Sequence, residues 1–236
     1  MRINKYIAHC GHCSRRKADE LIERGEVFVN GEKVRDFSRV VSKNDVVTIQ
    51  GKRIILEDTK IYVMLNKPSG YISSASDDRG RKTVMDIVGK HFKQRLYPIG
   101  RLDYETEGLL ILTNDGEIAN KLIHPSNNID KTYYVELDRP ITIQNIRNLE
   151  SGVDIGDHVT KKCKIKKVGV GTSTNKCIIT IGEGKNRQVR RMFETQRLRV
   201  RYLKRLQIGE LYLNDLRPGE FRALSKKEVR YLMSLN

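Results

Sequence analysis

Long hydrophobic runs are absent from this sequence of 236 residues. No stretch approaches the ~18 consecutive apolar residues that a membrane-spanning helix needs. The N-terminal stretch MRINKYIAHCGHCSRRK also lacks the apolar segment and small-residue cleavage site of a secretory signal. Cysteine is scarce, with four in the chain, and without a secretory signal these are expected to be reduced thiols. We therefore expect a cytoplasmic protein that does not associate with a membrane.

Motifs for common cofactors are missing as well. There is no G-x-x-x-x-G-K-[ST] phosphate loop, because GEGKNR has the wrong spacing. The sequence contains no G-x-S-x-G elbow, no H-E-x-x-H metal site and no pattern for a nicotinamide cofactor. We expect no cofactor, and the candidates that remain for chemistry are carboxylates, arginines and tyrosines.

A zinc site is the one metal hypothesis that the cysteines raise. Cys10 and Cys13 form a C-x-x-C pair next to His9. The other two, Cys163 and Cys177, have the wrong spacing for a zinc ribbon, and a structural site needs four well-placed ligands. We therefore expect no metal, and interpret Cys10 and Cys13 as small residues at a helix end.

Acidic residues are few relative to basic ones. The chain has 45 Lys and Arg against 29 Asp and Glu, a net charge of +16. Such a charge favours polyanions through phosphate contacts and counterion release. A generic basic surface or an anionic membrane would also fit, but no lysine-rich amphipathic helix or lipidation motif supports a membrane. Nucleic acid is the favoured partner, although charge alone does not separate RNA from DNA.

Residues 1–50 are predicted to form a compact unit of two helices and a small sheet. Ile3 and Ile7 share one face of a first helix, which Gly11 ends. Ser14 can cap a second helix, SRRKADELIERG. The pair Asn30-Gly31 then predicts a hairpin between strands.

Basic side chains gather where the second of these helices begins. They are Arg2, Lys5, Arg15, Arg16 and Lys17. A solvated charged face is the ordinary interpretation, but cations beside outward-pointing backbone N–H groups also form a phosphate-binding surface. The stretch RINKYIAHCGHCSRRKADELIERGEVFVNG resembles the S4-type RNA-binding domain. The resemblance implies that these five residues bind RNA, and it does not specify a reaction.

The sequence pattern of the remaining residues is typical of a single α+β domain. Residues 51–60 are charged and aperiodic and are predicted to be a linker, followed by a catalytic domain over 61–236. Strands are predicted within 61–70, 108–113, 131–137, 176–182 and 202–211, and helices within 117–123 and 186–197. Because no regular strand–helix–strand rhythm appears, we expect a mixed, mainly antiparallel sheet.

Asp103 is the first candidate for chemistry. It lies in GRLDYETEGLLILTNDG, where an acidic residue follows an arginine near a strand end. On an extended segment Arg101 and Asp103 would share a face. An ordinary structural ion pair between them would explain the pattern equally well.

Arginines and a tyrosine supply the other candidates. On a helix, Arg187, Arg190 and Arg191 would reach one side, as a phosphate-binding fork or as a solvated basic face. Tyr133 and Tyr134 should face opposite sides of a strand. One can therefore pack in the core while the other faces a cleft and stacks on a base.

Together these segments resemble the RsuA/RluB-type family of ribosomal-RNA pseudouridine synthases. The matching segments are IYVMLNKPSGYISS, YPIGRLDYETEGLLILTNDGE, KTYYVEL, EGKNRQVRRMF and LKRLQIGEL. With the N-terminal module, the resemblance covers almost the whole chain and removes the ion-pair alternative for Asp103.

The resemblance implies roles for particular residues. It makes Asp103 the catalytic carboxylate and places Tyr133 beside the target base. It puts Arg187 near the site, with Lys131 and Leu203 at further active-site positions. To this substrate-binding set we add the neighbouring arginines Arg101 and Arg190.

The implied reaction converts a uridine of ribosomal RNA to pseudouridine. It needs neither a metal nor an organic cofactor, because nothing is oxidised and no group enters or leaves. The segment ANKLIHPS looks more like the large-subunit branch, so 23S RNA is preferred and 16S RNA remains an alternative. We expect a monomer. A non-catalytic RNA-binding factor on the same fold is the rival hypothesis, whereas a methyltransferase would need a glycine-rich cofactor loop that the sequence lacks.

Overall fold

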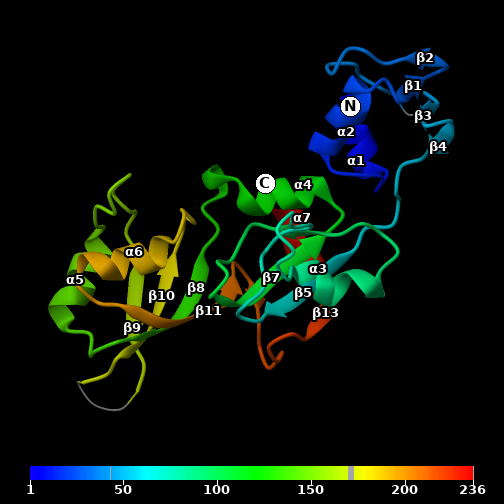
Figure 1. Ribbon diagram of the computed structural model, residues 1–236. Helices are drawn as coiled ribbons and strands as arrows, with labels where there is room; N and C mark the ends of the chain where they lie inside the picture. The colour runs from blue at the N-terminus through cyan, green and yellow to red at the C-terminus, as the bar shows by residue number, and fades with distance from the viewer. Residues whose placement is uncertain (43, 170–172, 236) are drawn as a thin grey trace.

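The chain builds two separate β-sheets, seen in a computed structural model that describes residues 1–42, 44–169 and 173–235 (Figure 1). The N-terminal part, blue in Figure 1, contains α1 (Ile3–His9), α2 (Arg15–Glu23), β1 (Val27–Val29), β2 (Glu32–Lys33), β3 (Val47–Ile49) and β4 (Lys52–Ile54). Its strands pair in the antiparallel order β2-β1-β3-β4. The predicted order of helix, helix and small sheet is confirmed.

Local sequence signals account for this N-terminal fold. The Ser14 hydroxyl accepts a hydrogen bond from the Lys17 backbone nitrogen at 3.2 Å and so caps α2. Ala18, Leu21 and Ile22 are buried on one face of α2, against Ile3 and Ile7 of α1. The hairpin forms at Asn30-Gly31, where both residues take the left-handed backbone conformation.

The strand β4 lies within residues 51–60, which the sequence pattern had assigned to a linker. It pairs with β3, so residues 52–54 belong to the N-terminal sheet and the linker is shorter than predicted. The pattern is weak because β4 is a three-residue edge strand with exposed Lys52 and Arg53. The connection then meets the second part of the chain, where Asn114 binds the Ile61 nitrogen at 2.9 Å and the Thr59 carbonyl at 2.7 Å.

Cys10 and Cys13 pack at the edge of the N-terminal core. Both are half-buried against it, and burial raises the pKa of both thiols, that of Cys10 to about 12. In the described residues, no group of three or more His, Cys, Asp or Glu side chains could hold a metal ion.

The second sheet of the described chain has nine strands in the order β13-β5-β7-β11-β8-β10-β9, with β6 paired to β7 and β12 to β11. Its strands are β5 (Tyr62–Lys67), β6 (Tyr97–Ile99), β7 (Glu107–Thr113), β8 (Lys131–Leu137), β9 (Lys164–Lys167), β10 (Lys176–Ile181), β11 (Val200–Ile208), β12 (Leu211–Tyr212) and β13 (Phe221–Ala223). Among these paired strands only β7 and β11 run parallel. The expected α+β fold on a mixed, mainly antiparallel sheet is confirmed.

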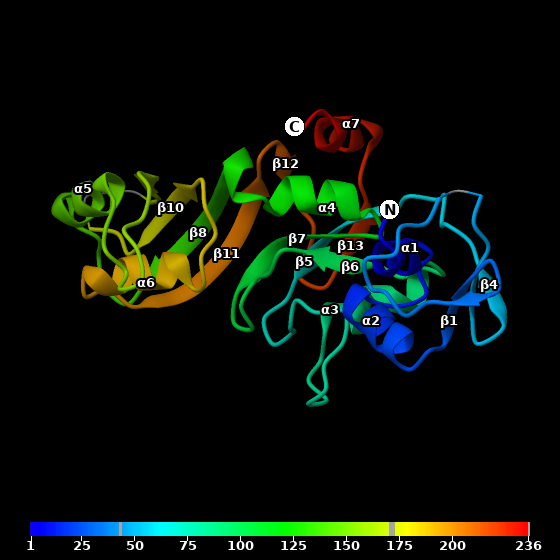
Figure 2. The same ribbon diagram turned by 90° about the horizontal axis from the view of Figure 1, so that it is seen from above.

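Helices cover both faces of this sheet (Figure 2). They are α3 (Val84–Val88), α4 (Gly116–Ile123), α5 (Ile143–Ser151), α6 (Gln188–Thr195) and α7 (Lys226–Ser234), with 3-10 turns at Gly89–His91 and Pro125–Asn127. Alternate residues of β5 and β7 divide between two cores. Val63 and Leu110 join the core of α3, α5 and α6, whereas Met64 and Leu109 join that of α4 and α7. No helix in the described residues is long and apolar enough to cross a membrane.

Gly108 brings the two halves of the sheet together. A Cβ atom at this position would lie 2.2 Å from the carbonyl oxygen and 2.5 Å from the backbone nitrogen of Arg205. Its φ of +108° is also one that residues with a side chain rarely adopt. The parallel contact between β7 and β11 therefore requires glycine at this position.

Candidate active site

A cavity of about 460 Å³ lies beside the junction of β7, β8 and β11. Its walls come from the loop that joins β6 to β7, the end of α4, strands β8 and β11, and residues 181–189. A volume of this size suits a small-molecule or single-nucleoside ligand. Six of the predicted site residues border it: Asp103, Arg101, Lys131, Tyr133, Arg187 and Leu203.

Asp103 reaches the cavity from the loop between β6 and β7. Its carbonyl oxygen accepts a hydrogen bond from the Thr106 nitrogen at 3.0 Å, which forms a tight turn. Arg101 also borders the cavity but is exposed. Among the described residues neither Arg101 nor Asp103 has an ion-pair partner within 4.0 Å. The structural ion pair considered from the sequence is therefore not formed.

A buried lysine that the sequence analysis missed supports the turn at Asp103. Lys67, at the end of β5, is completely buried. Its ammonium group donates to the carbonyl oxygens of Pro68 at 2.9 Å, Tyr104 at 3.3 Å and Thr106 at 2.8 Å. Burial lowers the pKa of Lys67 to about 8, and the charges of Glu107 and Asp103 act against this shift. The lysine before a proline at a strand end was the available signal.

One face of β8 and β11 forms the floor of the cavity. Side chains two apart on a strand share a face, so Lys131 lies beside Tyr133, and Leu203 lies beside Arg205. Tyr133 and Arg205 are also register partners across the two strands. The sequence analysis missed Arg205, although the same period of two would have placed it with Leu203.

Tyr133 and Tyr134 face opposite sides of the sheet, as predicted, but the division of roles is different. Tyr133 is only 8% exposed and belongs to the hydrophobic core while also bordering the cavity. Tyr134 is half-buried, and its hydroxyl donates to Glu136 at 2.7 Å. Tyr133 therefore borders the cavity, as the resemblance implies, and it also fills the core, a role that the sequence interpretation left to the other tyrosine.

A half-buried lysine and a buried arginine lie near each other at the floor. The Lys131 ammonium group donates to the Ile129 carbonyl at 2.6 Å. Burial lowers the pKa of Lys131, and the nearby charge of Arg205 lowers it further. Arg205 is 5% exposed, and its Nε donates to the Leu109 carbonyl at 2.8 Å.

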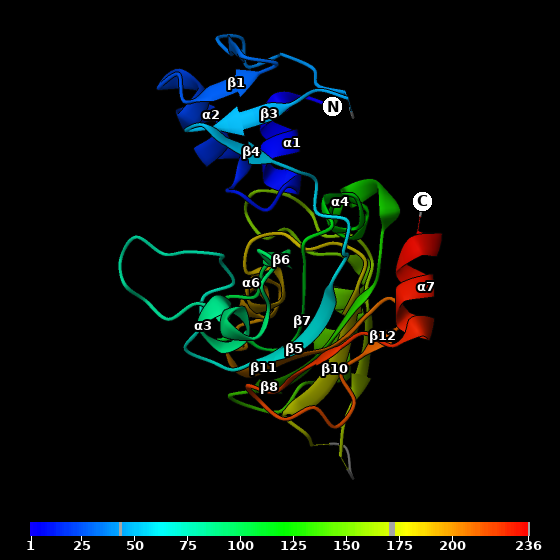
Figure 3. The ribbon, with the colours of Figure 1, turned by 90° about the vertical axis from the view of Figure 1, so that its right-hand side faces the viewer.

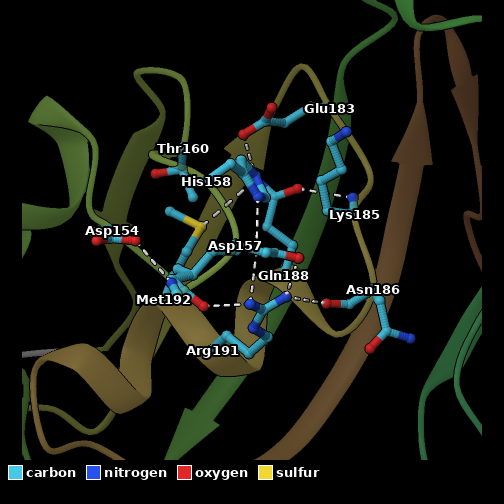
Figure 4. Close-up of polar contacts among 12 residues, drawn as sticks. Asp154, Asp157, His158, Thr160, Glu183, Lys185, Asn186, Gln188, Arg191 and Met192 are labelled. Carbon is cyan, nitrogen blue, oxygen red and sulfur yellow. Dashed lines mark hydrogen bonds and ion pairs between the residues drawn. The ribbon is translucent and has the colours of Figure 1, made fainter.

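The loop between β10 and α6 forms a wall of the cavity and is held by a polar network (Figure 4). The Gln188 amide donates to Glu183 at 2.6 Å and accepts from the Lys185 backbone nitrogen at 2.9 Å. Arg191 does not border the cavity and pairs with both carboxylate oxygens of Asp157 at 2.7 and 3.1 Å. The Arg191 pair lowers the pKa of Asp157 strongly.

Two of the three arginines of this segment, Arg187 and Arg190, reach one side, so the prediction that all three do is wrong. Arg187 precedes α6 with a left-handed φ of +47° and borders the cavity. Arg190 is 6% exposed and is not among the residues bordering the cavity. It donates to the Val200 carbonyl at 3.2 Å and to the Thr106 hydroxyl at 3.4 Å, with Glu105 at 3.8 Å. It therefore lies behind the Asp103 turn. Arg187 also comes within 4.0 Å of Glu105, so it meets Arg190 there although α6 begins at Gln188, whereas Arg191 pairs with Asp157.

The basic residues of the N-terminal domain remain at its surface. Arg2, Arg15, Arg16 and Lys17 are exposed, and Lys5 is half-buried. Lys17 pairs with Glu20 at 2.8 Å. This domain sits over the end of the large domain that carries α4 and β6 (Figure 3).

Comparison with known proteins agrees with this geometry. The S4 domain matches residues 1–47, and RNA pseudouridylate synthase matches residues 61–195. Ribosomal large subunit pseudouridine synthase B of Bacillus subtilis (strain 168) is 45% identical over 236 residues, which is 99% of this chain and 96% of that protein. Dual-specificity RNA pseudouridine synthase RluF of Escherichia coli (strain K12) is 39% identical over 237 residues, 100% of this chain and 79% of that protein.

A solved structure gives the same result. The crystal structure of a pseudouridylate synthase superimposes with a TM-score of 0.70 at 30% identity, over 98% of this chain and 99% of the other. The family predicted from the sequence motifs is therefore confirmed. The chain belongs to the RNA pseudouridylate synthase family, whose members are isomerases, and carries an S4 domain at its N-terminus.

Proposed function

We propose that this enzyme converts a specific uridine of large-subunit ribosomal RNA to pseudouridine, with Asp103 as the catalytic carboxylate. The observation that carries the proposal is the difference in hydrogen bonding between the two carboxylates that border the cavity, Glu183 and Asp103. Glu183 accepts hydrogen bonds from Gln188 at 2.6 Å and from the Lys161 nitrogen at 2.9 Å. Asp103 has no side-chain partner among the described residues, which leaves its carboxylate available for substrate.

The reaction breaks the C1′–N1 bond of uridine, turns the ring within the cavity and joins C5 to C1′. The C5 proton leaves and N1 gains a proton, so the atoms balance without a co-reactant. An ionised carboxylate serves either as the nucleophile at C1′ or as the base at C2′. The target base leaves its stack at a cost of a few kcal/mol, and the Tyr133 ring offsets part of that loss.

In this proposal the domains built on the two sheets have different roles. Residues 1–54 bind RNA through the exposed cations of α2 and its surroundings, and residues 61–236 carry out the chemistry. Backbone phosphate contacts hold the RNA in register while the cavity selects one base. We propose that the enzyme acts as a monomer in the cytoplasm. The large-subunit preference rests on the name of the Bacillus subtilis relative.

Pseudouridine mapping of ribosomal RNA, incubated with purified protein, tests the proposal. Wild type should form pseudouridine at one site of large-subunit RNA, and Asp103→Asn should form none while binding RNA with unchanged affinity. Asp215→Asn is the matched control, because Asp215 is exposed and does not border the cavity, and it should be fully active. Wild-type protein that binds the RNA but forms no pseudouridine would indicate a non-catalytic factor. Modification of small-subunit RNA alone would refute the large-subunit assignment.

A further inference from the structure

Arg205 is a buried cation without a counter-ion. It is 5% exposed, and its one hydrogen bond among the described residues runs from Nε to the Leu109 carbonyl at 2.8 Å. Nη2 is buried and has no hydrogen-bond partner. No carboxylate of the described residues lies within 4.0 Å of the guanidinium. A buried charge left unpaired carries a large desolvation penalty, so it is expected to persist where it meets a ligand.

Two lysines near Arg205 add to the unpaired positive charge around its guanidinium. The charge of Arg205 lowers the pKa of Lys131 and of Lys67, so Arg205 lies within electrostatic reach of both lysines. Lys67 directs its hydrogen bonds to three carbonyl groups of the Asp103 turn. Lys131 has one carbonyl partner, Ile129. Arg205 and Lys131 thus give the cavity floor an excess of positive charge and unused donors.

Arg205 is placed to contact the target base and not the RNA backbone. It is the register partner of Tyr133 on the neighbouring strand, and both border the cavity that Asp103 enters. Directly opposite residues on paired strands have Cβ atoms about 4.5–5.5 Å apart, so a base that lies against the Tyr133 ring is within reach of the Arg205 side chain. A guanidinium at the edge of that base can donate to a carbonyl oxygen of the ring.

We propose that Arg205, with Lys131 beside it, binds a carbonyl oxygen of the target uracil and stabilises the negative charge that the ring acquires in the reaction. When the C1′–N1 bond breaks, its electron pair stays with the ring and spreads over N1, O2, C5 and O4. The fixed cations stabilise this anion until C5 bonds to C1′ and the ring becomes neutral again. This inference rests on the proposed function, which it extends from the sugar side of the reaction to the base.

Single-turnover kinetics of Arg205 variants test this role. Arg205→Gln removes the charge and should slow pseudouridine formation by about 10²–10³-fold, the loss seen when a preorganised donor to a developing anion is removed. The affinity for RNA should stay within about two-fold, because the guanidinium lies at the floor and not at the phosphate surface. Arg205→Lys keeps the charge and should retain more activity than Arg205→Gln.

A purely structural role would give a different result. Arg222, which pairs with Glu228 at 2.7 Å away from the cavity, provides the matched control: Arg222→Gln should lower the melting temperature and leave the rate of folded enzyme unchanged. Added guanidinium ion should restore part of the rate of Arg205→Ala and have no such effect on Arg222→Gln.

Near-wild-type rates for folded Arg205→Gln would overturn the inference, as would a reduced rate that tracks the folded fraction and is not rescued by guanidinium. If Arg205→Gln does not fold, Arg205→Lys and the rescue of Arg205→Ala decide the question. Wild-type protein that forms no pseudouridine would instead refute the proposed function, so the two failures are distinguishable.

Discussion

Replacing Gly108 by alanine should separate the two strands on which the cavity depends. The added Cβ would lie 2.2 Å from the Arg205 carbonyl oxygen, whereas ordinary contact begins near 3.4 Å. Both partners are backbone in a sheet, so β7 and β11 must move apart by more than about 1 Å, which exceeds what packed interiors absorb. We expect a loss of more than about 4 kcal/mol in the free energy of unfolding, out of a typical total of about 5–15 kcal/mol.

Urea unfolding followed by circular dichroism measures this loss. Gly80→Ala is the matched control, because Gly80 also has a positive φ, of +71°, but a Cβ there would meet nothing within 4 Å. That control isolates backbone strain, which should cost about 1–2 kcal/mol. A Gly108→Ala protein that is no less stable than Gly80→Ala would refute the argument that the close approach, rather than φ alone, requires glycine.

Charge reversal at Arg15 and Arg16 should flatten the salt dependence of RNA binding. The slope of log K against log salt should fall by about 0.9 for each phosphate that the variant no longer neutralises. Filter binding at several salt concentrations measures this slope, and an unchanged slope would show that neither residue contacts phosphate. In single-turnover assays Tyr133→Leu should lose ~1–3 kcal/mol of base stacking, whereas Tyr133→Phe should keep most activity and Tyr134→Leu should react normally. A Tyr133→Leu enzyme that melts early yet reacts at the wild-type rate would show that the Tyr133 ring only fills the core. Burial lowers the pKa of Lys67 from 10.5 to about 8, so between these values the unfolded chain holds more protons and stability should rise with pH. In urea unfolding at pH 8–10.5, the free energy of unfolding of Lys67→Met should lack this rise. The same dependence on pH for wild type and Lys67→Met would contradict the lowered pKa of Lys67.

Local features of the fold were readable from sequence where short-range rules decide the structure. The Ser14 cap and the Asn30-Gly31 turn depend on neighbouring residues alone, and both form as predicted. Three helices, α3, α5 and α7, were not predicted. Each begins with a capping box, Thr83 with Asp86, Thr142 with Asn145 and Ser225 with Glu228. Thr83 with Asp86 and Ser225 with Glu228 match the [ST]-x-x-[DE] sequence signature, which would have located α3 and α7 but not α5.

The candidate site was predictable only in part, because its members come together through pairings that sequence spacing does not reveal. Asp103 and Tyr133 were identified through family motifs rather than from spacing. The period of two would have set Arg205 on the face of Leu203, but its place beside Tyr133 depends on the register of β11 against β8, which the sequence does not reveal. Helical spacing grouped Arg187 and Arg190 correctly, since both approach Glu105, but it misplaced Arg191 and did not reveal the left-handed backbone at Arg187. Such a strained residue beside a site is set by tertiary contacts and not by local propensity.

The parallel pairing of β7 with β11 also has a consequence for the order in which the protein forms during synthesis. Glu107 pairs with Lys204, about 100 positions further along the chain, so closing this contact requires a long loop to be ordered first. The N-terminal sheet needs only the first 54 residues, with Val29 opposite Val47. Domains fold as units and N-terminal ones first as the chain emerges. A growing chain therefore holds a complete RNA-binding domain well before it has an active site, and can engage RNA before it can modify it.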